Sequence, residues 1–439
     1  MILVVGMARS GLAAARLLQS RGEDVFVSDA GSPKTAAELD ALGIPRETGK
    51  HTLDRFLAAD EIVVSPGVPA EIAPLVAARS KGIPIVSELE VASRYLKGDV
   101  FAITGSNGKT TTTTLVGEIL RKSGGHVQVG GNIGTAMCAL VDTSTVQTVN
   151  VIEVSSFQLD GIRKFRPHVA ALLNITPDHL DRYPDFAAYR ASKFRIFANQ
   201  RKEDVAVLNA DDSQVCPPPA EIPAGRQRFF SRRQRVESGA FRAGGTLYLN
   251  GEPVMPAADV RLRGEHNIEN VLAAMAITAD YGVSTDALAS AIHEFRGVEH
   301  RIEFVAVVNG VEFFNDSKAT NVDSAIKAVE SFERGLILIL GGKDKGAPYD
   351  PLIEAMRGKV RHALLIGEAS GKIAEAIGAS FPHSRVASMA EAVKRAGDLG
   401  ISGDVVLLSP ACASFDMFEN YEHRGREFKK AVQELMRNA

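Results

Sequence analysis

The sequence predicts an α/β protein of three domains, each built on a largely parallel sheet. Three times along the 439 residues, an apolar strand pattern leads through a turn into a helical pattern. Short runs rich in Val, Ile and Leu, such as VVLL, are typical of parallel strands that are buried on both faces. Their alternation with helical patterns indicates crossover helices between neighbouring strands.

The first domain is expected to be Rossmann-like and to cover residues 1–92. Its first strand leads into the turn Gly6–Gly11 and then a helix, and the second strand ends on Asp29, as in a dinucleotide fingerprint. Ala8 replaces the middle glycine, which in that fingerprint lets the backbone approach a pyrophosphate, and this disfavours NAD. The remaining patterns are strands at 24–29, 61–67 and 83–87, with helices at 12–22 and 72–82.

The central domain is expected at 93–296, with a P-loop ATPase-type α/β fold. A strand at 100–105 runs into the loop TGSNGKT and a helix that ends near Lys122. Further on, FRAGGTLYLNG at 241–251 has short alternating strands with glycine-rich turns. This segment predicts a small antiparallel patch beside the parallel sheet.

The third domain is expected at 297–439, as a second Rossmann-like α/β unit that starts with a hairpin at 305–316. Three loops follow strand patterns and are rich in small polar residues: NDSKATN at 315–321, GGKDKG at 341–346 and SPACASFDMFENYEHRG at 409–425. Loops at the carboxyl ends of parallel strands line a common crevice. We therefore expect a substrate to be held between this domain and the P-loop domain.

Composition excludes several classes of protein. The net charge of −3 gives no basic face for nucleic acid. The three cysteines, Cys138, Cys216 and Cys412, are far apart, which argues against a disulfide framework or a zinc site and suits a reducing cytoplasm. No apolar run approaches the ~20 residues that cross a bilayer. We expect a cytoplasmic protein without a membrane span.

The loop TGSNGKT predicts a nucleotide site. Gly108, Lys109 and Thr110 fit the end of the pattern G-x-x-x-x-G-K-[ST], but Ile103 stands at its first glycine and the other glycine is Gly105. In this context backbone N–H groups hold phosphate oxygens, the lysine neutralises the β- and γ-phosphates, and the threonine hydroxyl faces Mg²⁺. The alternative is a polar turn before a threonine-rich helix, which the preceding strand disfavours.

Three further residues are candidates of unequal strength. Glu153 ends the apolar strand VNVIE, where a P-loop enzyme places an acid that holds the metal. His179 follows the strand pattern VAALLNIT between two aspartates, and a solvated structural loop is the alternative interpretation. Lys193 lies at the edge of an apolar helical stripe, where the pattern by itself favours a lysine whose amine reaches solvent.

Together these motifs resemble the Mur ligase family of bacterial cell-wall synthesis over essentially the whole chain. TGSNGKTT is similar to the P-loop of that family, with its glycine at Gly105. GNIG, EVSSFQL, DHLDRYP, YRASKFRIF, HNIENVLAA and EHRIE follow in family order. NDSKATN and SPACASFDMFENYEHRG look like the loops of the members that add D-glutamate.

The resemblance implies an ATP-dependent amide ligation in two steps. The L-alanine carboxylate of UDP-N-acetylmuramoyl-L-alanine takes the γ-phosphate of ATP, and the amine of D-glutamate displaces phosphate from the resulting acyl phosphate. Two Mg²⁺ ions and a CO₂-derived carbamate on Lys193 are implied as cofactors. Carbamate formation needs a neutral amine, so the pKa of Lys193 should be depressed by burial or nearby cations. We expect a monomer.

The resemblance also carries roles to individual residues. Catalysis would depend on Lys109, Glu153, His179 and Lys193. Mg²⁺ would be held by Thr110, Glu153, His179 and the Lys193 carbamate. ATP would contact Gly105, Ser106, Asn107, Gly108, Lys109, Thr110, Thr111, Asn267, Asn270, Arg301, Asp316 and Lys318. The UDP-sugar would contact Arg9, Ser10, Asp29, Gly67, Asn132, Ser155 and Gln158. D-glutamate would contact Thr320, Lys345, Ser414 and Tyr421.

Other interpretations remain open at this point. Another amino-acid ligase of the family, including one like folylpolyglutamate synthase, is disfavoured by the loops of the third domain. An inactive nucleotide-sugar sensor is disfavoured by the presence of Lys109, Glu153, His179 and Lys193. A dehydrogenase would rest on the Gly6–Gly11 turn alone. We also expect the third domain to swing toward the P-loop when ATP binds, because the ligands must meet across domains.

Overall fold

The computed structural model describes residues 1–31, 35–178, 182–216 and 226–437. The chain forms two compact units, which are described separately. The first comprises residues 1–259 and 268–293, and the second comprises 260–267 and 294–439. Among the described residues, no helix has both the length and the apolar character needed to cross a membrane.

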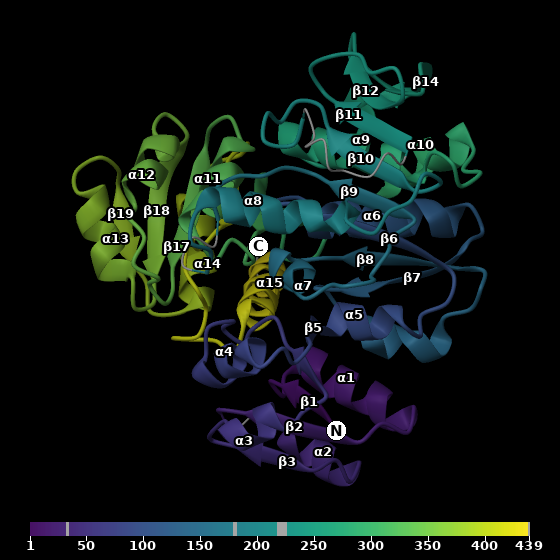
Figure 1. The fold of residues 1–439 in the computed structure, drawn as a ribbon. Coiled ribbons are helices and arrows are strands. Elements are labelled where there is room, and N and C mark those ends of the chain that lie inside the picture. The colour runs from purple at the N-terminus through teal and green to yellow at the C-terminus, as the bar shows by residue number, and fades with distance from the viewer. Residues whose placement is uncertain (32–34, 179–181, 217–225, 438–439) are drawn as a thin grey trace. The chain divides into compact units, whose positions relative to one another are not determined.

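The first unit contains an N-terminal sheet of five parallel strands in the order β3-β2-β1-β4-β5 (Figure 1). Strand β1 lies at its centre, so the turn that follows β1 opens at the middle of the sheet edge. The elements are β1 Ile2–Val5, α1 Arg9–Ser20, β2 Val25–Asp29, α2 Ala36–Ala41, β3 Arg46–Thr48, α3 Leu53–Leu57, β4 Glu61–Val64, α4 Ala73–Ser80, β5 Ile85–Ser87 and α5 Glu88–Ser93.

The first unit also contains a nine-stranded sheet in the order β14-β13-β12-β11-β10-β9-β6-β8-β7. All its pairs are parallel except β12–β13 and β13–β14. The elements are β6 Asp99–Thr104, α6 Lys109–Lys122, β7 His126–Gly131, η1 Met137–Thr143, β8 Thr148–Glu153, α7 Ser156–Asp160, β9 Val169–Leu172, α8 Phe186–Phe194, η2 Arg195–Phe197, β10 Val205–Asn209, β11 Arg226–Ser231, β12 Gly239–Ala243, β13 Thr246–Leu249, β14 Glu252–Pro256, η3 Ala257–Asp259, α9 Glu265–Thr278 and α10 Thr285–Glu294.

The N-terminal and nine-stranded sheets share one hydrophobic core. Leu12 and Leu18 of α1 belong to the same buried cluster as Met137 and Leu140 of η1. The buried carboxylate of Glu90 also accepts hydrogen bonds from the backbone N–H groups of residues 163–165. Apolar burial and a satisfied buried charge therefore join these two sheets into one unit.

The second unit is a three-layer α/β/α structure around a six-stranded sheet of order β15-β16-β20-β17-β18-β19. Along β17, Leu336, Leu338 and Leu340 pack on one face, while Ile337 and Ile339 pack on the other, as the two-residue period of a strand requires. The elements are β15 Glu303–Val308, β16 Val311–Asn315, α11 Val322–Glu330, β17 Leu336–Gly341, α12 Asp350–Met356, β18 Val360–Ile366, α13 Ser370–Ile377, β19 His383–Arg385, α14 Met389–Leu399, β20 Val405–Leu408 and α15 Tyr421–Arg437.

The three-domain α/β fold, the small antiparallel patch and the hairpin β15–β16 are confirmed. The domain boundaries themselves remain predictions. Several predicted elements have different ends. Helix α1 begins at Arg9, three residues before its apolar stripe, and strand β9 ends at Leu172 rather than near Thr176. The residues that follow β9 leave the sheet because they bind the P-loop, as described below.

Candidate active site

The P-loop joins the end of β6, which lies between β9 and β8 in the nine-stranded sheet, to the start of α6. Gly108 is the residue before α6 and has a φ of 83°, a left-handed conformation that suits glycine. A Cβ atom there would lie 2.2 Å from Oδ1 of Asn270. Gly108 therefore lets a helix N-terminus and its partial positive charge face the loop, an arrangement that suits phosphate.

Two lysine amines meet at one carbonyl oxygen of this loop. Nζ of Lys109 donates to the carbonyl oxygens of Gly105 and Ser106, both at 2.8 Å. Nζ of Lys193, from α8, donates to the same Gly105 oxygen at 2.9 Å. The amines of Lys109 and Lys193 are therefore neighbours at the start of the P-loop.

Lys193 is buried, with only 2% of its surface exposed, so the interpretation of its pattern as a solvent-reaching lysine is wrong. Burial, aided by the neighbouring charge of Lys109, lowers the pKa of Lys193 well below its usual value. This is the direction expected of a lysine that reacts with CO₂. The helical pattern gave the wrong prediction because α8 buries the residues at the edge of its apolar stripe as well as the stripe itself.

Glu153 and Thr110 form a hydrogen-bonded pair of oxygen groups beside the P-loop. In the parallel register Glu153 lies opposite Ile103, at the end of β6. The hydroxyl of Thr110 donates to Oε2 of Glu153 at 2.7 Å, and Nδ2 of Asn132 donates to Oε1 at 2.8 Å. A hydroxyl and a carboxylate are hard oxygen donors of the kind that Mg²⁺ prefers. These residues therefore fit the ion that the P-loop sequence implies.

A cavity of about 610 Å³ opens at the carboxyl edge of the N-terminal sheet. It is lined by five residues that were expected to contact a UDP-sugar: Arg9, Ser10, Asp29, Gly67 and Asn132. Ala8, the residue before α1, makes no side-chain cap, so the helix N-terminus is available to an anion. The carboxylate of Asp29 accepts from the backbone N–H groups of Met7 and Gly31, both at 2.7 Å, which holds the turn in place.

Ser155 and Gln158, also expected on the substrate path, form a capping box at the start of α7. Oε1 of Gln158 accepts from the backbone N–H of Ser155 at 3.0 Å. Nε2 of Gln158 is buried and has no hydrogen-bond partner among the residues that the structure describes. A buried donor without a partner is a candidate for contact with a ligand.

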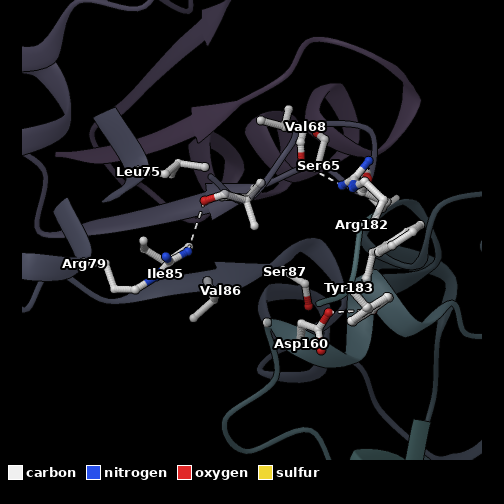
Figure 2. A pocket seen from close by; sticks show the side chains of 15 residues that line it. Ser65, Val68, Leu75, Arg79, Ile85, Val86, Ser87, Asp160, Arg182 and Tyr183 are labelled. Atoms are coloured by element: carbon white, nitrogen blue, oxygen red, sulfur yellow. Dashed lines mark hydrogen bonds between the residues drawn. The ribbon is translucent and has the colours of Figure 1, made fainter. Parts of the chain in front are cut away.

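A second cavity, of about 200 Å³, shares Ser65, Pro66 and Val68 with the first and is also lined by β5, α7 and residues 182–183 (Figure 2). The guanidinium of Arg182 lies 4.5 Å from the ring centre of Phe157 and donates to the carbonyl oxygen of Val68 at 3.1 Å. The hydroxyl of Tyr183 donates to Asp160 at 2.7 Å. These contacts anchor the chain just after His179, a predicted ligand that lies outside the described residues.

In the second unit, the three predicted loops follow the neighbouring strands β16, β20 and β17. The guanidinium of Arg424 joins two of them, because it donates to the carbonyl oxygens of Ser317 at 2.8 Å and Cys412 at 3.1 Å. Backbone hydrogen bonds between Lys343 and Ala413 join the third. Arg424 is buried and comes from α15, and it was not among the residues predicted from the sequence.

The predicted ATP residues of this unit lie around a strained backbone. Arg301 stands between His300 and Ile302, whose φ angles of 66° and 43° are rare for residues other than glycine. The carboxyl of Asp316 accepts from the Ile302 N–H at 3.2 Å and from the Ser409 hydroxyl at 3.0 Å. Burial raises the pKa of Asp316 to about 7.

The remaining predicted residues of the second unit form close pairs. Nζ of Lys345 lies 3.5 Å from Oγ1 of Thr320. Nζ of Lys318 lies 5.4 Å from the ring centre of Tyr421, within cation–π distance. Three further predicted residues, Ser414, Asn267 and Asn270, do not belong to these pairs. Ser414 is buried in the loop after β20, and Asn267 of α9 donates to the carbonyl oxygen of Arg263 at 2.7 Å, also within the second unit. Asn270 belongs to the first unit, beside Gly108.

Comparison with known proteins gives consistent matches along the chain. Three family models match in order: a Mur ligase MurD-like N-terminal domain at 1–87, a Mur ligase middle domain at 103–278 and a Mur ligase glutamate ligase domain at 300–412. UDP-N-acetylmuramoylalanine–D-glutamate ligase from Acidobacterium capsulatum is 49% identical, over 98% of this chain and 95% of its own. The protein of the same name from Koribacter versatilis is 47% identical, over 99% and 97%.

The chain belongs to the Mur ligase family. Solved structures agree on the fold. UDP-N-acetylmuramate-alanine ligase from Thermotoga maritima has a TM-score of 0.63 at 21% identity, with 99% of each chain covered. A pseudomurein peptide ligase type C from Methanothermus fervidus has a TM-score of 0.60 at 19% identity, again with 99% of each chain covered.

In this Mur ligase, sequence reasoning missed the residues that hold the P-loop. Asn174 exchanges two side-chain hydrogen bonds with the backbone of Asn107, at 2.8 and 3.1 Å. Tyr189 is hydrogen-bonded to Ser106 at 3.0 Å, and its ring centre lies 4.7 Å from Nζ of Lys193. Two signals were present: a polar residue just after a buried strand, and a tyrosine four positions before Lys193 on the same helix face.

Proposed function

We propose that this Mur ligase joins D-glutamate to the L-alanine carboxylate of UDP-N-acetylmuramoyl-L-alanine, with ATP converted to ADP and phosphate. The observation that carries the proposal is identity of 47–49% over nearly the whole chain with relatives that are named for that reaction. The P-loop, Glu153 and buried Lys193 provide the chemistry that such a reaction needs. A carboxylate is a poor electrophile, and phosphorylation supplies the leaving group that the amine of D-glutamate displaces.

The P-loop residues would bring two anions together. The N-terminus of α6 and the amine of Lys109 would hold the β- and γ-phosphates of ATP. The acceptors of Lys109 are loop carbonyl oxygens, and the amine can exchange them for phosphate oxygens without leaving the loop. Repulsion between the substrate carboxylate and the triphosphate would fall where these positive groups cluster, in a region of low dielectric.

Thr110 and Glu153 would hold one Mg²⁺, and His179 and a carbamate on Lys193 would hold a second. When bound, the ions would offset the negative charge of the transferring phosphoryl group. The fit of Lys193 rests on its neutral amine, because only the unprotonated nitrogen attacks CO₂ and then loses a proton to give a carbamate. An anionic carbamate would in turn supply the oxygen atoms that a lysine lacks.

The loops of the second unit would bind D-glutamate and part of ATP. Lys345, Thr320, Ser414 and Tyr421 would contact the amino acid, whose two carboxylates need cationic or hydroxyl partners. Asn267, Asn270, Arg301, Asp316 and Lys318 would contact ATP. Because these residues are divided between the two units, we propose that the C-terminal domain closes toward the P-loop on binding. We further propose a cytoplasmic monomer.

Release of ADP with a panel of amino acids tests the proposed function. Release should require UDP-N-acetylmuramoyl-L-alanine and D-glutamate together. L-glutamate, lysine and diaminopimelate should each give a small fraction of that rate. Equal rates with L-glutamate or with a diamino acid would contradict the specificity, and release of ADP without any amino acid would contradict the ligation.

Replacement of Lys193 tests the carbamate. Lys193→Ala should lower kcat by about 10²-fold or more, because a group that acts on the transferring phosphoryl is removed. Formate or acetate should restore part of the rate, and ¹³C-bicarbonate should give a carbamate signal in the wild type only. Lys202→Ala, an exposed lysine of the same domain, is the control. Loss of activity with neither rescue nor a carbamate signal would refute this role.

A further inference from the structure

His51 lines the 610 Å³ cavity of the N-terminal sheet, but the resemblance assigned it no role. It lies in the loop after β3, half-buried, in a T-shaped contact with Phe56 at a centroid distance of 5.5 Å. Strand β3 is the second neighbour of β1, at the edge of the sheet. His51 is therefore a cavity residue in the loop after β3, and its contact with Phe56 limits rotation of its ring.

A chain of hydrogen bonds runs behind His51. Its Nδ1 lies 2.7 Å from Oγ of Ser28, a fully buried residue of β2. The same Oγ donates to Oε1 of Glu47 at 2.7 Å, and the backbone N–H of Thr52 donates to that carboxylate oxygen at 3.0 Å. The arrangement is thus a carboxylate, a hydroxyl and an imidazole in series.

This chain determines which ring nitrogen carries the proton. Burial raises the pKa of Glu47, but hydrogen bonds from Thr52 and Ser28 outweigh it and leave that pKa below its usual value. The ionised carboxylate can only accept, so Ser28 donates its single proton to Glu47 and must accept from Nδ1–H of His51. In the neutral ring, Nε2 is then a hydrogen-bond acceptor. No hydrogen bond to Nε2 exists among the residues covered by the structure.

The order of strands places the end of β3, which leads into the loop of His51, two strands away from the turn after β1. A diphosphate would sit at the N-terminus of α1, which follows β1. Because neighbouring strands lie about 4.8 Å apart, the end of β3 is roughly 10 Å from the end of β1. That span is comparable to the distance from a diphosphate to the sugar and base of a nucleoside.

We propose that Nε2 of His51 accepts a hydrogen bond from the nucleoside of the UDP-sugar, with Ser28 and Glu47 as positioning residues. This inference rests on the proposed function for the identity of the nucleotide. Uridine offers two kinds of donor at this end, the ribose hydroxyls and N3–H of uracil. Either donor could bond to Nε2, because the hydrogen bond from Nδ1–H to Ser28 leaves Nε2 of the neutral ring as an acceptor. An acceptor at this position favours a nucleoside donor over an anion.

Calorimetric titration with UDP tests the contact. His51→Ala should weaken UDP binding about tenfold, the effect of one lost hydrogen bond. His51→Gln, which can place an amide oxygen near the position of Nε2, should recover part of the affinity. Lys50→Ala, an exposed neighbour that does not line the cavity, is the control and should match the wild type. Equal UDP affinity in His51→Ala and the wild type would overturn the proposal.

Two nucleotide analogues identify the donor. Either 2′-deoxy-UDP or 3-methyl-UDP should bind the wild type about tenfold more weakly than UDP. Whichever analogue loses affinity should bind His51→Ala as tightly as UDP binds that variant, because the hydrogen-bond acceptor on the protein has been removed. If both analogues lose affinity equally in the wild type and in His51→Ala, His51 does not contact the nucleoside and the proposal fails.

The positioning role has its own readout. Ser28→Ala should raise KM for the UDP-sugar and leave kcat and KM for ATP unchanged. It should have no further effect in a His51→Ala background, because Ser28 acts through the imidazole. Additive losses would refute the chain of bonds. A wild type that binds UDP but releases no ADP would contradict the proposed function while the nucleoside contact stands.

Discussion

The chain contains two turns that look alike, one after β1 and the other after β6. Each joins an interior strand with two parallel neighbours to a helix that has no side-chain cap, and each is rich in glycine. Around the first turn lie Arg9, Asp29 and a wide cavity. Around the second lie two lysine amines and a hydroxyl–carboxylate pair. We therefore propose that the same strand–turn–helix arrangement serves binding in one place and chemistry in the other.

The difference lies in what the neighbouring strands contribute. Beside the P-loop, β8 ends in Glu153 and α8 brings in Lys193, so a carboxylate and a second amine lie beside the loop. Beside the first turn, Asp29 accepts hydrogen bonds from the turn itself. Its carboxylate therefore holds the backbone of the turn. A helix N-terminus suits an anion in both places, but the proposed chemistry belongs to the second site alone.

The largest expected effect comes from replacing the P-loop lysine. Lys109→Met should lower kcat for ADP release by about 10²–10³-fold, because a donor that faces developing charge is lost. Arg9→Met, the corresponding change at the first turn, should raise KM for the UDP-sugar and leave kcat unchanged. Steady-state kinetics at saturating ATP separate the two. A fall in kcat with Arg9→Met would remove the distinction between the turns.

An intermediate effect should follow from adding one carbon to the first turn. A Cβ atom at Gly11 would lie 1.8 Å from the carbonyl oxygen of Gly6, which is backbone and cannot rotate away. Gly11→Ala should therefore destabilise the first unit by about 1–3 kcal/mol and weaken UDP binding. Gly371→Ala, in helix α13 of the other unit, is the control and should be neutral or stabilising. Calorimetric melting would show whether only Gly11→Ala lowers a transition.

The smallest effect is expected where the P-loop is held from behind. Asn174→Ala removes both hydrogen bonds to the backbone of Asn107, so KM for ATP should rise about tenfold with little change in kcat. Asn199→Ala removes a side-chain bond to the carbonyl oxygen of Phe165, away from the loop, and should leave KM for ATP unchanged. Similar KM values for both variants would show that Asn174 does not position the loop.

The positions of both turns could be read from the sequence because strand and helix periods are local. The end of β8 at Glu153 and the loops after β16, β17 and β20 were predicted on the same ground. The burial of Lys193 could not be predicted from the sequence. The apolar stripe of α8 does not show how far neighbouring elements cover the residues at the edge of that stripe. Asn174 was missed because its role requires that β9 lie next to β6, a pairing between segments about 70 residues apart.

The sequence alone determined the type of fold, the P-loop and the family to which the chain belongs, since these depend on residue type and spacing along the chain. The tertiary structure decided which groups form hydrogen bonds with one another or with a common acceptor. Lys109 and Lys193 meet at the oxygen of Gly105, and Glu47, Ser28 and His51 form one chain of hydrogen bonds. The physical reason is that hydrogen bonds and pKa values depend on distances of about 3 Å between side chains. Only the packing of distant segments sets those distances.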